Sequence, residues 1–204
     1  MGDQVDLLWE RCPPESEVFA VLDGAADPEL FPRLLESGLK HRCLFDAKIS
    51  GALAQASPHI VALKHPNGFT DWLLTQGWGK SYGIYFTSQQ PLATLYRDRR
   101  KLLRVKTETG QPLLFRFYDP RILRAFLPTC APEELKVVFG KVQSFWLEPE
   151  EDDEGRRPAH WTCLQRGEDG ALLSEDLPCE VRSATRSPLS VVVYEGAGDA
   201  ADPQ

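Results

Sequence analysis

Short apolar runs alternate with amphipathic runs between residues 18 and 148, and this order constrains the fold more than any other feature. "VFAVLDGA", "SYGIYFTS" and the run His59–Leu63 have the length and apolar content of buried strands. Between them, "ADPELFPRLLESG" and "GFTDWLLTQGWG" carry apolar residues at helical spacing. Strands and helices in this order predict an α/β or α+β domain, with a central mixed β-sheet flanked by helices.

Turn and cap residues refine these elements. Asp27 and Thr70 are predicted to cap the two helices just described, and Gly38 is predicted to end the first of them. Further along, "CLFDA" and "KVQSFWLE" predict short strands, and "PLATLYRDRRKLL" and "TCAPEELKVVFG" predict helices. "RVKTETGQPLLFRFY" predicts a hairpin that turns at Gly110.

The chain divides by composition into five segments. We predict a polar lead-in, the α/β domain, an acidic loop, an extension with strands and a disordered tail, at residues 1–17, 18–148, 149–159, 160–195 and 196–204. The strands of the extension are "HWTCLQRG" and "LSVVVYE". They could form an add-on hairpin or lie on a partner protein.

Composition and charge exclude several classes of protein. The chain is 42% hydrophobic and 26% charged, which is ordinary for a soluble globular protein. Residues 1–147 hold 18 Lys and Arg against 16 Asp and Glu, and residues 148–204 hold 5 against 14. The near-neutral domain gives no general support for nucleic-acid binding. An acidic N-terminus and the lack of a long apolar run predict neither a signal peptide nor a membrane span.

The cysteines and histidines predict no metal site or cofactor. The five cysteines are odd in number, scattered, and without C-x-x-C spacing, which is typical of a reduced, cytoplasmic protein. His41, His65 and His160 show no metal-ligand spacing with one another.

The segment "LLFRFYDPRILRAFLP" places charged residues between a predicted strand and a predicted helix. Asp119 has the position of an N-cap, and Pro120 suits the first helical position because its missing N–H would be unpaired there. Strand alternation puts Arg116 on a face that a sheet covered on both sides would bury. We therefore expect Arg116 to form a structural ion pair, with Asp23 or Asp119 as the partner.

The alternative interpretation is that these residues belong to the active site of an enzyme. A small α/β hydrolase or nuclease would use Asp23, His59 and Asp119, and Asp46 also lies near a strand end. The chain contains no G-x-S-x-G, no H-E-x-x-H and no phosphate-binding glycine loop. We interpret His59 as a structural, hydrogen-bonded histidine and predict no catalytic residue.

The block around RFYDPR, with LDGA at 22–25 and Gly-Trp-Gly at 77–79, resembles one family. The chain resembles, over roughly residues 18–148, the type VI secretion effector chaperone or adaptor family, also called domain of unknown function 4123. The resemblance implies a cytosolic, non-enzymatic protein that holds a toxic effector and helps load it onto the VgrG spike or its PAAR-type tip. Its motif residues here are Asp23, Gly24, Arg116, Tyr118, Asp119, Pro120 and Arg121.

Candidate partner-binding residues come from the aromatic and basic runs. We predict partner contacts at Trp78, Tyr82, Tyr85, Arg97 and Arg100, because aromatic and arginine side chains are enriched at interface hot spots. The run Tyr96–Lys106 carries six basic residues and one Asp, and it could be a solvated helix face, a phosphate site or a rim for an acidic segment.

That acidic segment could belong to the cargo or be the chain's own loop at 148–154. The cargo could bind as a helix in a groove or as an added strand. An immunity or accessory protein of the same secretion locus is a third possible class. The oligomeric state cannot be predicted.

Overall fold

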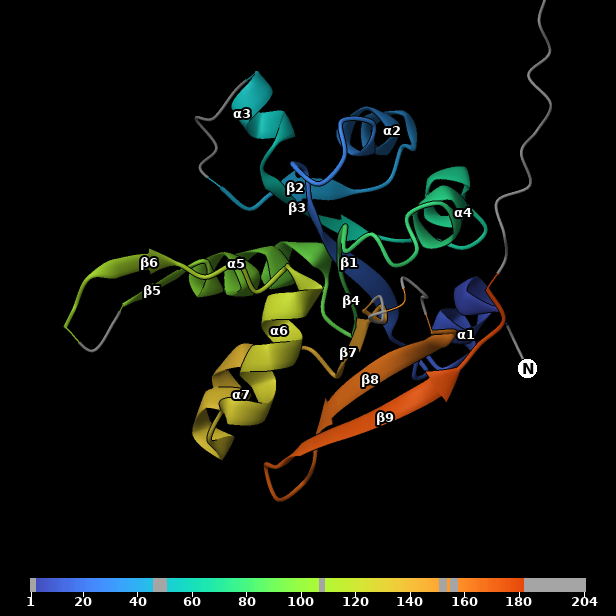
Figure 1. Cartoon of the computed structure of the whole chain (residues 1–204). Coiled ribbons are helices and arrows are strands. Elements are labelled where there is room, and N and C mark those ends of the chain that lie inside the picture. The colour runs from blue at the N-terminus through green and yellow to red at the C-terminus, as the bar shows by residue number, and fades with distance from the viewer. Residues whose placement is uncertain (1–2, 46–50, 107–108, 151–153, 155–157, 182–204) are drawn as a thin grey trace, which may run out of the picture.

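Seven strands form one sheet in the order β2-β3-β1-β4-β7-β8-β9, in a computed structural model that describes residues 3–45, 51–106, 109–150, 154 and 158–181 (Figure 1). The strands are β1 (Glu17–Asp23), β2 (His41–Cys43), β3 (Pro58–Ala62), β4 (Gly83–Ser88), β7 (Ser144–Leu147), β8 (His160–Arg166) and β9 (Leu172–Pro178). A separate ribbon of β5 (Arg104–Lys106) and β6 (Pro112–Leu114) projects from the body (Figure 1).

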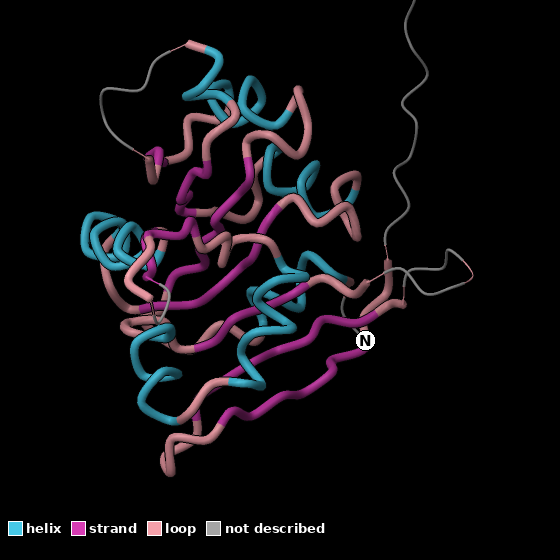
Figure 2. The backbone as a smooth tube through the Cα atoms, turned by 60° about the vertical axis from the view of Figure 1, so that its left-hand side comes forward, coloured by secondary structure: helices cyan, strands magenta, loops and turns pink. Residues whose placement is uncertain are grey.

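The predicted class is confirmed, and the expectation of a mixed sheet is wrong. Every pairing between the described strands is antiparallel. Figure 2 shows these strands as one twisted sheet that runs through the molecule. Alternation of strand and helix along the chain does not require parallel strands, because a helix can also fill the connection between antiparallel neighbours.

Helices cover both faces of the sheet (Figure 1). They are α1 (Gln4–Glu10), α2 (Leu30–Glu36), α3 (Ala52–Gln55), α4 (Gly68–Thr75), α5 (Leu92–Leu102), α6 (Pro120–Phe126), the 3₁₀ turn η1 (Leu127–Thr129) and α7 (Pro132–Phe139). Alternate residues of β1 point to opposite faces. Ala20 and Leu22 pack with α1, α2 and α4, and Phe19 and Val21 pack with α5, α6 and α7.

The two ends of the chain are more integrated than their composition indicates. The expected polar lead-in contains α1, whose Val5 and Leu8 are fully buried. In the C-terminal extension, β8 pairs with β7 and continues the main sheet, and Trp161 is fully buried in the core. The pairing strand β9 was not expected, because Leu172–Pro178 is too polar to read as a strand. The predicted strand "LSVVVYE" lies outside the described residues.

Several local predictions are corrected by the hydrogen bonds. Asn67, and not Thr70, caps α4, since its side chain accepts from the backbone N–H of Phe69 and Thr70. Asp27, three positions before α2 begins, accepts from the N–H of Glu29, so it forms a turn ahead of the helix. Gly38 ends this helical segment at φ 67°, as expected.

Candidate functional site

The charged residues of the RFYDPR block meet the end of β1. The Arg116 Nη2 lies 2.8 Å from Asp23 Oδ2 and 3.6 Å from Asp119 Oδ2. Asp23 also accepts a bond from the N–H of Ala25, and its side chain is 11% exposed. Both carboxylates expected to pair with Arg116 are therefore within its reach. The expectation that Arg116 lies on a covered face of a strand is wrong, since β6 ends at Leu114 and the Arg116 side chain is 44% exposed.

Asp119 and Pro120 begin α6 as predicted. The Asp119 carboxylate accepts from the backbone N–H of Arg121 at 3.1 Å, and Pro120 occupies the first turn. The Arg121 side chain donates both Nε and Nη2 to the same carboxylate, at 2.9 and 2.8 Å. Burial opposes ionisation of Asp119, but the hydrogen bonds from Arg121 and the nearby guanidinium groups outweigh it and lower the pKa.

Gly24 and Tyr118 complete this junction. A Cβ at Gly24 would lie 1.9 Å from the carbonyl oxygen of Gln55, so no other residue fits without moving the backbone. Tyr118 is buried, and the Arg116 guanidinium lies 5.7 Å from the centre of its ring. Together these contacts fasten the end of β1 to the start of α6, so each residue of the junction has a structural role.

His59 does not join the junction. In the antiparallel register His59 is opposite Leu22, whereas Asp23 is opposite Pro58, so the two side chains leave opposite faces of the sheet. The His59 ring lies 4.7 Å from the Phe31 ring of α2, and its Nε2 bonds the carbonyl of Ala54. Burial lowers the pKa of His59. The catalytic combination of Asp23, His59 and Asp119 is therefore not assembled, and Asp46 lies outside the described residues.

We predicted partner contacts at Trp78, Tyr82 and Tyr85, but the structure buries all three side chains. They are 4%, 3% and 0% exposed, so none can contact a partner in this structure. The Trp78 and Tyr85 rings both meet Trp161 edge-on, at 4.7 and 5.2 Å between centroids. The burying partner comes from β8, a strand that composition had placed in an appended segment.

Each of the two tyrosines donates its hydroxyl to a carboxylate. Tyr82 bonds Asp27, and Tyr85 bonds the buried Glu148 at 3.0 Å. Glu148 also accepts from the N–H of Gly79. Burial and the adjacent carboxylate raise the pKa of Tyr85 well above its usual value. Sequence reasoning missed Glu148, because it reads as the first residue of an acidic loop.

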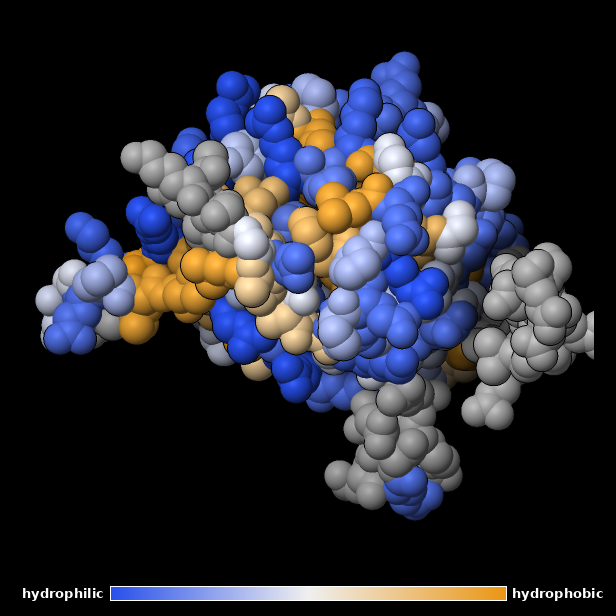
Figure 3. Space-filling view, turned by 90° about the horizontal axis from the view of Figure 1, so that it is seen from above, coloured by the Kyte–Doolittle hydropathy of each residue, from blue (hydrophilic) through white to orange (hydrophobic). Residues whose placement is uncertain are grey.

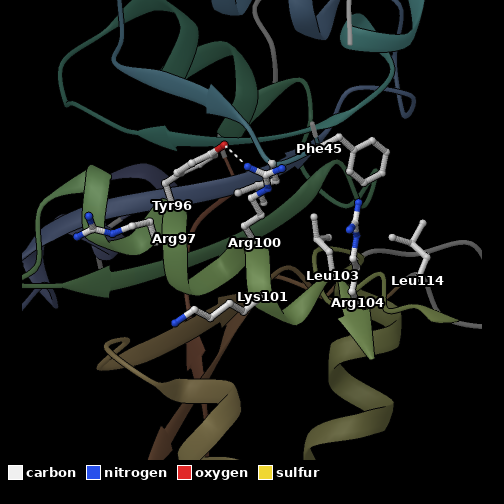
Figure 4. Close-up of a pocket in the computed structure, with 9 residues that line it drawn as sticks. Phe45, Tyr96, Arg97, Arg100, Lys101, Leu103, Arg104 and Leu114 are labelled. Atoms are coloured by element: carbon white, nitrogen blue, oxygen red, sulfur yellow. Dashed lines mark hydrogen bonds between the residues drawn. The ribbon is translucent and has the colours of Figure 1, made fainter. Parts of the chain in front are cut away.

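The two predicted arginines, Arg97 and Arg100, line an open cavity of about 650 Å³. The cavity lies between the chain after β2, the second half of α5 and the β5–β6 ribbon (Figure 4). Its lining consists of Leu44, Phe45, Tyr96, Arg97, Arg100, Lys101, Leu103, Arg104 and Leu114. We call this feature the α5 groove. It combines an apolar floor with four cationic side chains and no acidic one among the described residues.

The basic run is divided between the groove and the core. Arg99 is 1% exposed and donates to the carbonyls of Val138 and Phe139 at the end of α7, at 2.6 and 3.1 Å. Burial lowers the pKa of its guanidinium to about 10, so it stays charged at neutral pH. The expectation that the basic residues form one solvated face is therefore wrong at Arg99.

Glu150 of the acidic loop contacts α6. Arg124 of α6 donates to Glu150 at 3.1 Å and to the carbonyl of Glu148. Residues 151–153 of the acidic loop lie outside the described residues. The hypothesis that the loop meets the basic run stays open for residues 151–154.

The described residues contain neither a membrane-spanning helix nor a cluster of metal ligands. No described helix has the length and hydropathy needed to cross a membrane. Among the same residues, no group of three or more His, Cys, Asp and Glu side chains could hold a metal ion. All five cysteines are free thiols, and burial raises the pKa of Cys163 and Cys179 to about 11.

A comparison with known protein families matches residues 18–136 to the Domain of unknown function (DUF4123). The match covers more than half of the chain. The chain belongs to the DUF4123 family. Searches of curated proteins and of solved structures found no match.

The DUF4123 segment contains both the junction and the groove. It runs from β1 into α7, so it includes Asp23, Arg116 and Asp119 as well as the cavity lining. The DUF4123 match ends before β7, yet β7 and β8 supply Trp146 and Trp161 to the core. The folded unit of this family member therefore extends beyond the matched residues.

Proposed function

We propose that the chain is a cytoplasmic chaperone or adaptor of type VI secretion. It binds a cognate toxic effector, stabilises it, and helps load it onto the VgrG or PAAR spike before secretion. Its activity is binding, and no catalytic residue or cofactor is required. A chaperone that binds the folded or assembly-competent cargo raises the soluble fraction of that cargo by mass action.

The observation that carries the proposal is the contrast between the junction and the α5 groove. An enzyme would need ionisable residues at the ends of the strands. Here Asp23, Arg116 and Asp119 form ion pairs with one another instead. The groove instead leaves apolar and cationic groups exposed on one surface. Such a surface suits recognition of another polypeptide.

Co-expression with the product of an adjacent effector gene tests the proposal. We expect the effector to co-purify with the chain, and its soluble level to fall when the chain is absent, because the bound state protects apolar segments. The measurement is affinity purification followed by quantification of soluble effector and of effector secreted with VgrG. An unrelated cytoplasmic protein with the same tag is the control.

Unchanged effector solubility and secretion in the absence of the chain would contradict the proposal. Protection of a recipient cell from the toxin would instead assign the chain to the immunity proteins. Turnover of a small substrate that is lost in a folded Asp119→Asn variant would assign it to the hydrolases or nucleases.

A further inference from the structure

We infer that the α5 groove is the cargo-binding surface, and that it takes a peptide segment with large apolar side chains flanked by carboxylates. This inference rests on the proposed function, because it assumes that the ligand is a polypeptide. It adds where that polypeptide binds and which side chains it carries. The groove is defined by the nine lining residues given above, and Figure 4 shows how they converge from three parts of the chain.

The floor of the groove provides the apolar contact. Leu44 and Leu103 form its buried base, while Phe45 remains partly exposed. Leu114, on the projecting ribbon, is 55% exposed. In Figure 3 the hydrophobic surface at the left follows this ribbon. A volume of about 650 Å³ lies within the usual range for ligand-binding clefts, so the groove can accept several side chains.

The rim of the groove provides the charge that selects the occupant. Arg97, Lys101 and Arg104 are exposed, and no ion pair joins them to a carboxylate among the described residues. Arg100 is held by the Tyr96 hydroxyl at 3.2 Å and points across the helix surface (Figure 4). Cations that pair with no described carboxylate, around an apolar floor, favour an occupant that brings both carboxylates and apolar side chains.

A nucleic acid fits this surface less well than a peptide. Phosphate recognition needs a track of cations along the backbone, whereas here the cations surround an apolar depression. The whole chain carries a net charge of −7, which opposes long-range attraction of a polyanion. A short acidic and apolar peptide has a local charge and an apolar surface that match the groove.

The ribbon supplies a matched control. In its register Leu114 is opposite Arg104 and faces the groove, whereas Leu113 is opposite Val105 on the other face. Leu113 and Leu114 are 53% and 55% exposed, so replacing either with aspartate removes similar apolar surface and adds the same charge. A groove ligand should distinguish these two variants.

The test selects peptides of random sequence against the full chain and measures their binding by fluorescence anisotropy. We expect enriched peptides to combine acidic and large apolar residues. Leu114→Asp should weaken their affinity by at least about tenfold, and Leu113→Asp should leave it unchanged. The affinity should also fall as NaCl rises from about 0.05 to 0.5 M.

A pair of charge-reversal variants distinguishes an effect of the groove on peptide binding from an effect of net charge. The double variant Arg97→Glu/Arg104→Glu should lose peptide binding, and Lys136→Glu/Lys141→Glu, with the same net charge, should retain it. Equal binding by all variants, or selection that yields no groove-dependent peptide, would overturn the inference. Binding of a single-stranded oligonucleotide through Arg97 and Arg104, without peptide binding, would also overturn it.

The failure of this inference is distinguishable from the failure of the proposed function. If the effector still co-purifies with Leu114→Asp and with the Arg97/Arg104 variant, the chain is a chaperone that binds cargo elsewhere. If no effector co-purifies with the unaltered chain, the proposed function itself fails.

Discussion

Replacing Arg99 with methionine is expected to lower the free energy of unfolding by about 2–3 kcal/mol. The Arg99 guanidinium donates to two carbonyls at the end of α7, where the helix leaves acceptors without internal partners. Methionine fills much of the space but donates no hydrogen bond, so the Val138 carbonyl loses the guanidinium and the Phe139 carbonyl keeps only its bond from the N–H of Val142. The interaction also places a positive charge at the negative end of the α7 dipole.

Arg97→Met is the control for this prediction, because Arg97 lies on the same helix but is exposed. Its change in stability should stay within about 0.5 kcal/mol. Urea unfolding followed by circular dichroism measures both variants. Equal stability of Arg99→Met and the unaltered chain would show that the carbonyls find other partners.

Asp119→Ala is expected to cost about 2 kcal/mol, since it removes the N-cap of α6 and the paired acceptor of Arg121 together. Asp119→Asn should cost less, because an amide oxygen can still accept the backbone N–H. The same unfolding experiment at neutral pH ranks the two variants. Equal losses for the two variants would mean that the charge, and not the cap, dominates, because both substitutions remove the charge.

The pKa of Asp119 gives this prediction a pH dependence. The pKa is lowered in the folded protein from an ordinary value of 3.8, so ionised Asp119 stabilises the fold above that value. This contribution is lost as the pH falls through the lower, folded pKa. The stability gap between the unaltered chain and Asp119→Asn should therefore stay constant at pH above about 5 and close below pH 4.

Much of the fold can be predicted from the sequence because local chemistry determines it. The run before Asp23 is apolar on both faces, and Asp119-Pro120 has the chemistry of a helix start in any context. The carboxylate partners of Arg116 were also predictable, although the reason given for them was wrong, because Arg116 lies beyond the end of β6 and is half-exposed. The direction of strand pairing was not, because alternation of elements fits parallel and antiparallel neighbours equally.

The candidate site required contacts between residues distant in sequence. Trp78 lies between two glycines and appears exposed until β8 brings Trp161 against it, 83 positions further along the chain. Arg99 sits in a basic run, and only the packing of α7 reveals that it faces inward. The groove likewise joins Phe45, Arg100 and Leu114, which no local pattern relates to one another.

The central claim is that the charged junction maintains the fold while the groove recognises a polypeptide. Its most direct test measures the effector co-purified with Arg116→Gln and with Leu114→Asp, together with the melting temperature of each variant. We predict that Arg116→Gln melts a few degrees lower yet retains the effector below its transition, and that Leu114→Asp keeps its melting temperature but loses the effector. Loss of the effector from a thermally unchanged Arg116→Gln variant, with full retention by Leu114→Asp, would contradict it.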